Sequence, residues 1–125
     1  MGDSMEKDLE LKKLDTFIGT LHYYRYFGIF LTDGIKYIME NGYAWFVNDI
    51  IALLLSPTPK LRKHLQKDPF LVIHLKVNTE KAEADMIIED GNGNTLYKQH
   101  YKYTDAKRDL KLYYIDNVLM LSSEY

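Results

Sequence analysis

The sequence predicts an α+β fold, in which two to three N-terminal helices pack on one face of a C-terminal five-stranded antiparallel meander sheet. Apolar residues recur at helical spacing over residues 6–67, and from residue 70 onward they alternate with polar ones. A length of 125 residues with 46% hydrophobic residues fits a single domain with a real core. We expect residues 1–5 to be disordered or left over from cloning, residues 6–67 to be mainly helical, and residues 70–125 to form the sheet.

The first part of the helical region carries recognisable start and stop signals. Residues 6–17 have the pattern of a short amphipathic helix ended by Gly19. Thr32 or Asp33 can cap a second helix, and Asn41-Gly42 is a good left-handed stop for it.

A long helix with a wide apolar side is predicted over residues 43–55, ended by the two prolines that follow. Residues 60–67 are expected to add one short basic turn of helix. Residues 20–31 fit either an extended segment or a helical turn. The sequence alone leaves that segment open.

The sheet region divides into five segments with period-two alternation, joined by short turns that favour antiparallel pairing. The apolar face of the first segment should meet the apolar side of the 43–55 helix. Asp116-Asn117 is a plausible two-residue turn between the last two strands. The expected strands are residues 70–78, 82–90, 95–103, 110–115 and 118–122.

Charge pairing across these strands favours one register. A two-residue turn at Thr79-Glu80 would place His74 opposite Asp85, and a turn at Asn92-Gly93 would place Asp85 opposite His100. Two imidazoles flanking a carboxylate could hold a divalent metal or form an acid–base pair. The alternative is a ladder of opposite charges on a solvated sheet face.

A second face of the 43–55 helix is a candidate binding surface. Projected at 3.6 residues per turn, Trp45, Asn48 and Asp49 fall together on a narrower side of small and polar residues. This face either packs against residues 20–31 or receives a partner.

The chain has eleven tyrosines, and an aromatic-rich patch suits a protein interface as well as a core. Tyr23, Tyr24 and Arg25 lie in the first tyrosine cluster and are further candidate binding residues.

Composition excludes several function classes. The net charge of −2 gives no general electrostatic footprint for nucleic acid, although basic residues cluster at positions 60–67. The chain has no cysteine, so it has no disulfide, thiol nucleophile or cysteine-based zinc site, which fits a cytoplasmic location. The polar start is unlike a secretory signal, and the apolar run at 43–55 is too short to cross a bilayer. No catalytic motif or cofactor fingerprint is present.

Short motifs occur in order along the chain. They are Gly19-Thr20 with Tyr23-Tyr24, Thr32-Asp33-Gly34-Ile35-Lys36-Tyr37, Ala44-Trp45 with Asp49-Ile50-Ile51-Ala52, Asp90-Gly91-Asn92-Gly93, Tyr103-Thr104-Asp105, Leu112-Tyr113 and Ser123-Glu124-Tyr125. In this order they resemble a family of small bacterial and phage-associated proteins that has no assigned function. The chain departs from that pattern at Leu21 and Ser122. The resemblance implies a phage or mobile-element setting, where small proteins often bind a host protein, including as inhibitors of host defence.

These observations predict a non-enzymatic, cytoplasmic protein-interaction module that needs no cofactor and binds a protein partner or forms a homodimer. One alternative is a small-molecule or metal site at His74, Asp85 and His100. Another is weak nucleic-acid binding through residues 60–67 and nearby tyrosines.

Overall fold

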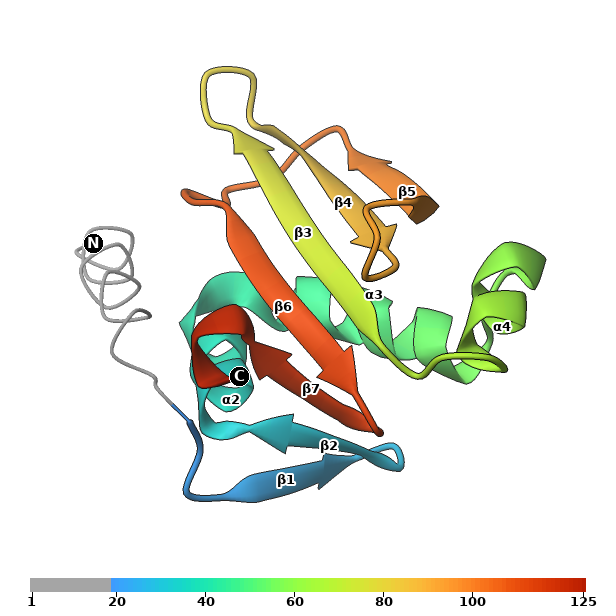
Figure 1. Cartoon of the computed structure of the whole chain (residues 1–125). Coiled ribbons are helices and arrows are strands. Elements are labelled where there is room, and N and C mark those ends of the chain that lie inside the picture. Colours follow the sequence, from blue (N-terminus) through green and yellow to red (C-terminus); the bar gives the residue numbers. More distant parts are fainter. Residues whose placement is uncertain (1–18) are drawn as a thin grey trace.

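The computed structural model describes residues 19–125 and shows an α+β fold (Figure 1). The helix expected over residues 6–17, and the expectation for residues 1–5, lie outside the described residues. In chain order the elements are β1 (Tyr23–Tyr26), β2 (Ile29–Thr32), α2 (Asp33–Ile38), the π-helical segment η2 (Met39–Tyr43), α3 (Ala44–Leu55), α4 (Pro59–Leu65), β3 (Leu71–Asn78), β4 (Glu83–Glu89), β5 (Thr95–Tyr101), β6 (Leu110–Ile115), β7 (Val118–Leu121) and the 3₁₀ turn η3 (Ser122–Glu124).

The strands form one seven-stranded mixed sheet in the order β1-β2-β7-β6-β3-β4-β5. The predicted five-stranded antiparallel meander is therefore wrong in two respects. Strand β6 pairs with β3 instead of β5, and residues 20–31 form a β1–β2 hairpin that joins the sheet through parallel pairing of β2 with β7. The reason lies in β3, whose residues Leu71, Ile73 and Leu75 are fully buried. A strand this apolar needs a partner on each side to satisfy its backbone, so it lies inside the sheet.

The predicted register between β3 and β4 is also wrong, by two residues. Leu75 lies opposite Met86, and Lys76 lies opposite Asp85. The loop between the strands is longer than two residues, and Ala82 in that loop has a φ of 54°. A shift of two residues keeps every side chain on its expected face, so the apolar face was predicted correctly while the cross-strand partners were not.

Other local predictions are confirmed. Asp85 lies opposite His100 across β4 and β5, and the turn at Asp116-Asn117 joins Ile115 to Val118 as a two-residue connection. The long helix α3 ends at Leu55, as expected.

Helix α3 passes behind the sheet in Figure 1, and α4 lies to its right, beyond the start of β3. Phe46, Val47 and Ile50 of α3 are fully buried in the core that includes the inner face of β3. Thr32 caps α2 as predicted, because its Oγ1 accepts from the Ile35 amide at 3.4 Å. The other face of the sheet is turned toward the viewer, and no α-helix of residues 19–125 lies across it there.

Candidate functional site

The predicted binding face of α3 is largely occupied by contacts within the chain. Tyr101 on β5 donates from Oη to Asp49 Oδ2 at 2.7 Å, and its ring meets the Trp45 ring edge-on at 4.9 Å between centroids. Burial, with the hydrogen bond to Asp49, raises the pKa of Tyr101 well above its ordinary value. Trp45 Nε1 donates to the Gly42 carbonyl at 2.9 Å. Trp45 and Asp49 therefore join α3 to β5.

Asn48, one residue before Asp49, faces the opposite edge of the sheet. Tyr26 at the end of β1 donates from Oη to Asn48 Oδ1 at 2.7 Å. The sequence suggested that this helix face packs against residues 20–31. Asn48 does contact that segment, whereas Trp45 and Asp49 pack on β5.

A groove opens beside this contact, between the tip of the β1–β2 hairpin and α3. We call it the hairpin groove, and its volume is about 370 Å³. This volume lies within the range of pockets that bind ligands or anchor side chains. Its walls are mainly apolar. The lining residues are Tyr26, Phe27, Asn48, Ile51, Ala52 and Leu55.

Phe27 at the tip of the hairpin combines two unfavourable features. Tyr26 pairs with Ile29, so Phe27 and Gly28 form a two-residue turn, and their φ angles are 52° and 82°. Positive φ at both central residues marks a type I′ turn, which prefers Asn, Asp or Gly because a bulky side chain is strained there. The Phe27 side chain is also 67% exposed.

The β6–β7 turn provides a comparison inside the same molecule. Asp116 and Asn117 occupy its two central positions with φ angles of 47° and 72°. The chain therefore uses the residue types that this turn favours in one hairpin and a phenylalanine in the other.

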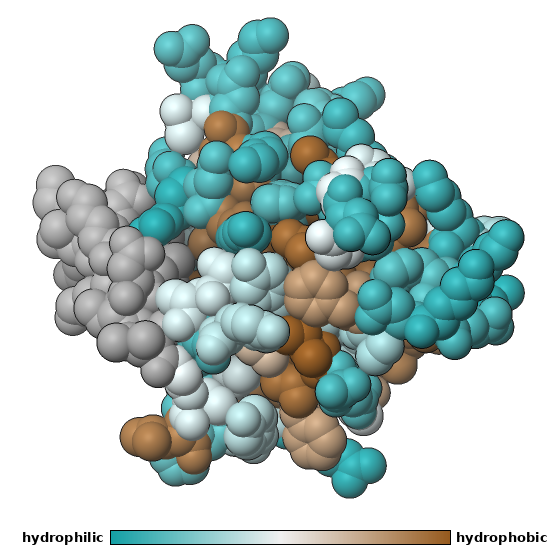
Figure 2. Space-filling model, in the orientation of Figure 1, coloured by the Kyte–Doolittle hydropathy of each residue, from teal (hydrophilic) through white to brown (hydrophobic). Residues whose placement is uncertain are grey.

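Exposed apolar residues occur on both faces of the hairpin, before it and at the end of α3. At the lower end of the molecule, where Figure 1 places β1 and β2, Figure 2 shows brown and tan atoms in separate groups with paler atoms between them. We call this set the hairpin patch. It consists of Leu21 (88% exposed), Tyr23 (59%), Phe27 (67%), Phe30 (39%) and Leu55 (57%).

Two other candidate residues, Tyr24 and Arg25, lie on β1 with different surroundings. Arg25 is exposed, whereas Tyr24 is half-buried and donates from Oη to Asp33 Oδ1 at 3.1 Å. Partial desolvation, followed by the hydrogen bond to Asp33, raises the pKa of Tyr24. The Lys36 ammonium lies 4.5 Å from the centre of the Tyr24 ring. Tyr24 therefore belongs to a local polar cluster. Of the three candidate binding residues on β1, only Tyr23 and Arg25 are exposed.

Asp33 is the centre of that cluster. Its Oδ2 accepts from the backbone amides of Leu21 at 2.8 Å and His22 at 3.3 Å, and its own amide donates to Thr20 Oγ1 at 2.9 Å. The bond from the Leu21 amide is the largest cause of a lowered Asp33 pKa, and the hydroxyl of Tyr24 contributes. The cluster fixes the chain that enters β1 to the start of α2.

Glu124 makes a similar connection at the C-terminal end. Its carboxylate accepts from Thr32 Oγ1 at 2.6 Å, from the Gly34 amide at 3.0 Å and from the Leu121 amide at 2.9 Å. Gly34 is needed for this approach, because a Cβ at its position would lie 2.5 Å from Glu124 Oε1. The Thr-Asp-Gly and Ser-Glu-Tyr motifs thus meet in one structural clamp.

The predicted row of His74, Asp85 and His100 does not form. The two-residue register shift places His74 opposite Ile87, and His74 Nε2 contacts Glu89 at 3.0 Å instead of Asp85. His100 Nδ1 does contact Asp85 at 2.8 Å. Among residues 19–125, no group of three or more potential ligands is placed to hold a metal ion. The metal site predicted at these three residues is therefore wrong.

The basic residues 60–67 form most of α4 and the chain that follows it. Lys60, Arg62 and Lys63 are exposed, while Leu61 between them is fully buried. This pattern gives one solvated basic face over an apolar anchor. Nucleic-acid binding by this segment stays a prediction.

Comparison with known families places the chain in a family without an assigned function. A family model described as a family of unknown function, DUF6876, matches residues 8–125. The chain belongs to DUF6876. Neither the curated proteins nor the solved structures contain a match to it. Within the described part of this DUF6876 chain, the helices are too short or too polar to span a membrane.

Sequence reasoning missed Phe27 and Leu55, which frame the hairpin groove. A signal for Phe27 was present, because a Phe-Gly pair between two short aromatic segments can be read as a hairpin tip with an atypical first residue. Leu55 carried no such signal, since its exposure depends on where the hairpin lies relative to α3.

Proposed function

We propose that this DUF6876 protein is a non-enzymatic interaction module that binds an extended segment of a partner protein along the β1 edge of its sheet. Side chains of that segment would enter the hairpin groove. The observation that carries the proposal is Phe27, which is strained in its backbone and exposed in its side chain. A residue unfavourable on both counts is typical of a functional site.

The position of β1 supports an extended partner. Strand β1 is the first in the sheet order, so one side of its backbone has no neighbouring strand among residues 19–125. A partner strand added there would gain main-chain hydrogen bonds, and its alternate side chains would reach the hairpin patch. Phe27 and Leu55 would then anchor it from the two walls of the hairpin groove.

The opposite edge of the sheet is less suited to this role. Strand β5 presents Lys98 and His100 as exposed residues, and Tyr101 near its end is engaged with α3. Charged side chains on an edge strand discourage the addition of another strand. Strand β1 has one exposed charge, Arg25, beside exposed Tyr23.

The resemblance to phage-associated proteins suggests the class of partner. We propose that the partner is a host protein and that the module acts in a phage or mobile-element setting, for example as an inhibitor of host defence. This activity would need neither a cofactor nor a catalytic residue, and its place would be the cytoplasm. A second copy of the chain is the competing occupant of the same edge.

The proposal is tested by selecting random peptides from a display library on the immobilised full chain. We expect enrichment of peptides with apolar residues at alternate positions, and we expect Phe27→Asn to abolish their binding. Lys98→Ala on the opposite edge is the matched control and should bind as the parent does. Failure to enrich any peptide, or binders that ignore Phe27→Asn, would overturn the proposal.

Light scattering on the purified protein separates the two occupants. A monomer supports a partner of different sequence. A dimer that Phe27→Asn separates into monomers would show that a second copy fills the β1 edge, and would contradict the proposed partner.

A further inference from the structure

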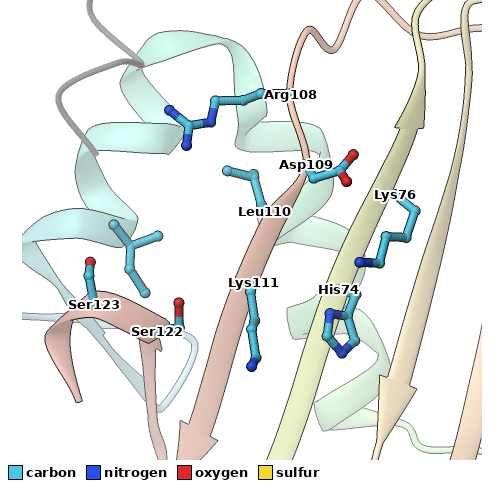
Figure 3. A pocket seen from close by; sticks show the side chains of 9 residues that line it. His74, Lys76, Arg108, Asp109, Leu110, Lys111, Ser122 and Ser123 are labelled. Carbon is cyan, nitrogen blue, oxygen red and sulfur yellow. The ribbon is translucent and has the colours of Figure 1, made fainter. Parts of the chain in front are cut away.

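The open face of the sheet holds a second pocket, which shares no lining residue with the hairpin groove. It lies over β3 and β6 next to the C-terminal turn, and its volume is about 380 Å³. We call it the outer-face pocket. Its lining residues are His74, Lys76, Arg108, Asp109, Leu110, Lys111, Leu121, Ser122 and Ser123 (Figure 3).

The outer-face pocket combines cations with hydroxyl groups. Figure 3 shows Lys76 and His74 on one side, Ser122 and Ser123 on the other, and Lys111 between them. Among residues 19–125, no carboxylate lies within ion-pair distance of the Lys76 or Lys111 ammonium. Ammonium and hydroxyl groups around one pocket suit an anion with several oxygen atoms.

One acidic residue, Asp109, lies in the same pocket. Its Oδ1 accepts a hydrogen bond from the Val77 amide of β3 at 2.7 Å, and this bond partly offsets the negative charge of the carboxylate. Among the lining residues, the two ammonium groups of Lys76 and Lys111 outnumber the single carboxylate of Asp109, although the whole chain has a net charge of −2. The local charge therefore favours an anion.

A group of aromatic rings lies next to Lys111, although none of these rings lines the pocket itself. The Tyr113 ring lies 5.6 Å from the Phe70 ring and 5.4 Å from the Tyr125 ring, and the Lys111 ammonium lies 5.6 Å from the Tyr113 centroid. Tyr125 is 81% exposed. Because the Tyr113 and Tyr125 rings stand at 71° to each other, a planar heterocycle can stack on one of them and meet the other at its edge, while a phosphate attached to it reaches the lysines.

We propose that the outer-face pocket binds a mononucleotide, with its phosphate between Lys76 and Lys111 and its base outside the pocket, stacked on Tyr113 with an edge toward Tyr125. A pocket of about 380 Å³ suits a ligand of this size. A longer nucleic acid suits it less well. The next strand, β4, carries Asp85 and Glu89 on this face, and their charges would repel further phosphates.

The inference is independent of the proposed interaction surface, because no residue of the outer-face pocket lines the hairpin groove. Calorimetric titration of the full chain with the four ribonucleoside monophosphates tests it. Inorganic phosphate, ribose 5-phosphate and a short single-stranded oligonucleotide serve as comparison ligands. We expect at least one monophosphate to bind, and to bind at least about tenfold more tightly than inorganic phosphate, because only the nucleotide can stack.

Three variants locate the binding. The double variant Lys76→Ala/Lys111→Ala should weaken nucleotide binding about tenfold or more, whereas Lys98→Ala, an exposed lysine on the same face of β5, should leave it unchanged. Tyr113→Leu should reduce nucleotide affinity toward that of ribose 5-phosphate. Circular dichroism without ligand verifies that each variant is folded.

Several results would overturn the inference. No binding of any monophosphate would do so, as would binding that survives the double lysine variant. Equal affinities for a nucleoside monophosphate and for inorganic phosphate would show that Tyr113 does not stack on the base. If the oligonucleotide binds more tightly than any monophosphate, with a strong dependence on salt, the ligand of this pocket is a nucleic-acid strand and not a mononucleotide.

Discussion

At the scale of single residues, two carboxylates of the described chain act as connectors. Asp33 gathers the segment before β1 onto the start of α2, and Glu124 fastens the C-terminal turn to the same helix start. Both accept backbone amide hydrogen bonds, which are strong when the acceptor is charged. The start of α2 is thus the meeting point of the N-terminal hairpin and the C-terminal turn.

Asp33 predicts a specific dependence of stability on pH. Its pKa in the folded protein is lowered, mainly by the hydrogen bond from the Leu21 amide. The folded state therefore favours the ionised carboxylate, and the resulting stability is complete above about pH 4, the ordinary value for an aspartate. It is lost as the pH falls through the lowered value.

We therefore expect Asp33→Asn to lower the melting temperature by several degrees near about pH 6, and the gap to the parent to narrow below about pH 4. Thermal melts at a series of pH values measure this. Asp105→Asn removes an exposed aspartate elsewhere and is the control. A gap that stays constant down to ~pH 2 would contradict the role given to the Asp33 charge.

At the scale of secondary structure, the β1–β2 hairpin is attached to the rest of the sheet by few bonds. Strand β2 pairs with β7 at Phe30↔Val118 and Leu31↔Leu119. Asn117 strengthens this junction, since its Nδ2 donates to the Gly28 carbonyl at 2.7 Å and its carbonyl accepts from the Phe30 amide at 3.0 Å. The hairpin is thus an element that can open before the rest of the sheet.

Asn117→Gly tests this attachment, because glycine keeps the backbone conformation at φ 72° and removes the bridging side chain. We expect amide hydrogen exchange in β1 and β2 to accelerate about tenfold, the effect of losing roughly one net hydrogen bond, while β3 and β4 stay protected. Asp116→Gly in the same turn is the matched control. Equal acceleration throughout the sheet would show that the hairpin is not a separate unit.

At the scale of the whole molecule, the sequence predicted local structure and missed long-range arrangement. The apolar pattern located α3 and all strands from β3 to β7, because periodicity reports which face each segment buries. It did not report strand order. Pairing β6 with β3 instead of β5 changes no side-chain periodicity, and neither does a register shift of two residues between β3 and β4.

The same limit explains the outcome at the candidate sites. The metal site depended on His74 facing Asp85, so it failed with the register. The helix face with Asn48 was found by projection, but its neighbours Tyr26 and Tyr101 come from opposite edges of the sheet. No pattern within one segment could indicate that both edges reach the same helix.

Phe27 is the residue on which the proposed binding role depends most, because its turn position disfavours it and its exposed ring is free to contact a partner. Asparagine suits the first central position of a type I′ turn far better than phenylalanine does. Phe27→Asn should therefore stabilise the protein by about 1 kcal/mol, even though it removes the contact of Phe27 with the Tyr26 ring at 4.7 Å.

The most direct test is urea-induced unfolding of the parent and of Phe27→Asn under identical conditions. We expect a higher free energy of unfolding for Phe27→Asn, with an unchanged dependence on urea concentration. A lower free energy of unfolding would show that Phe27 serves the fold. That result would contradict the claim that this residue is kept for binding a partner.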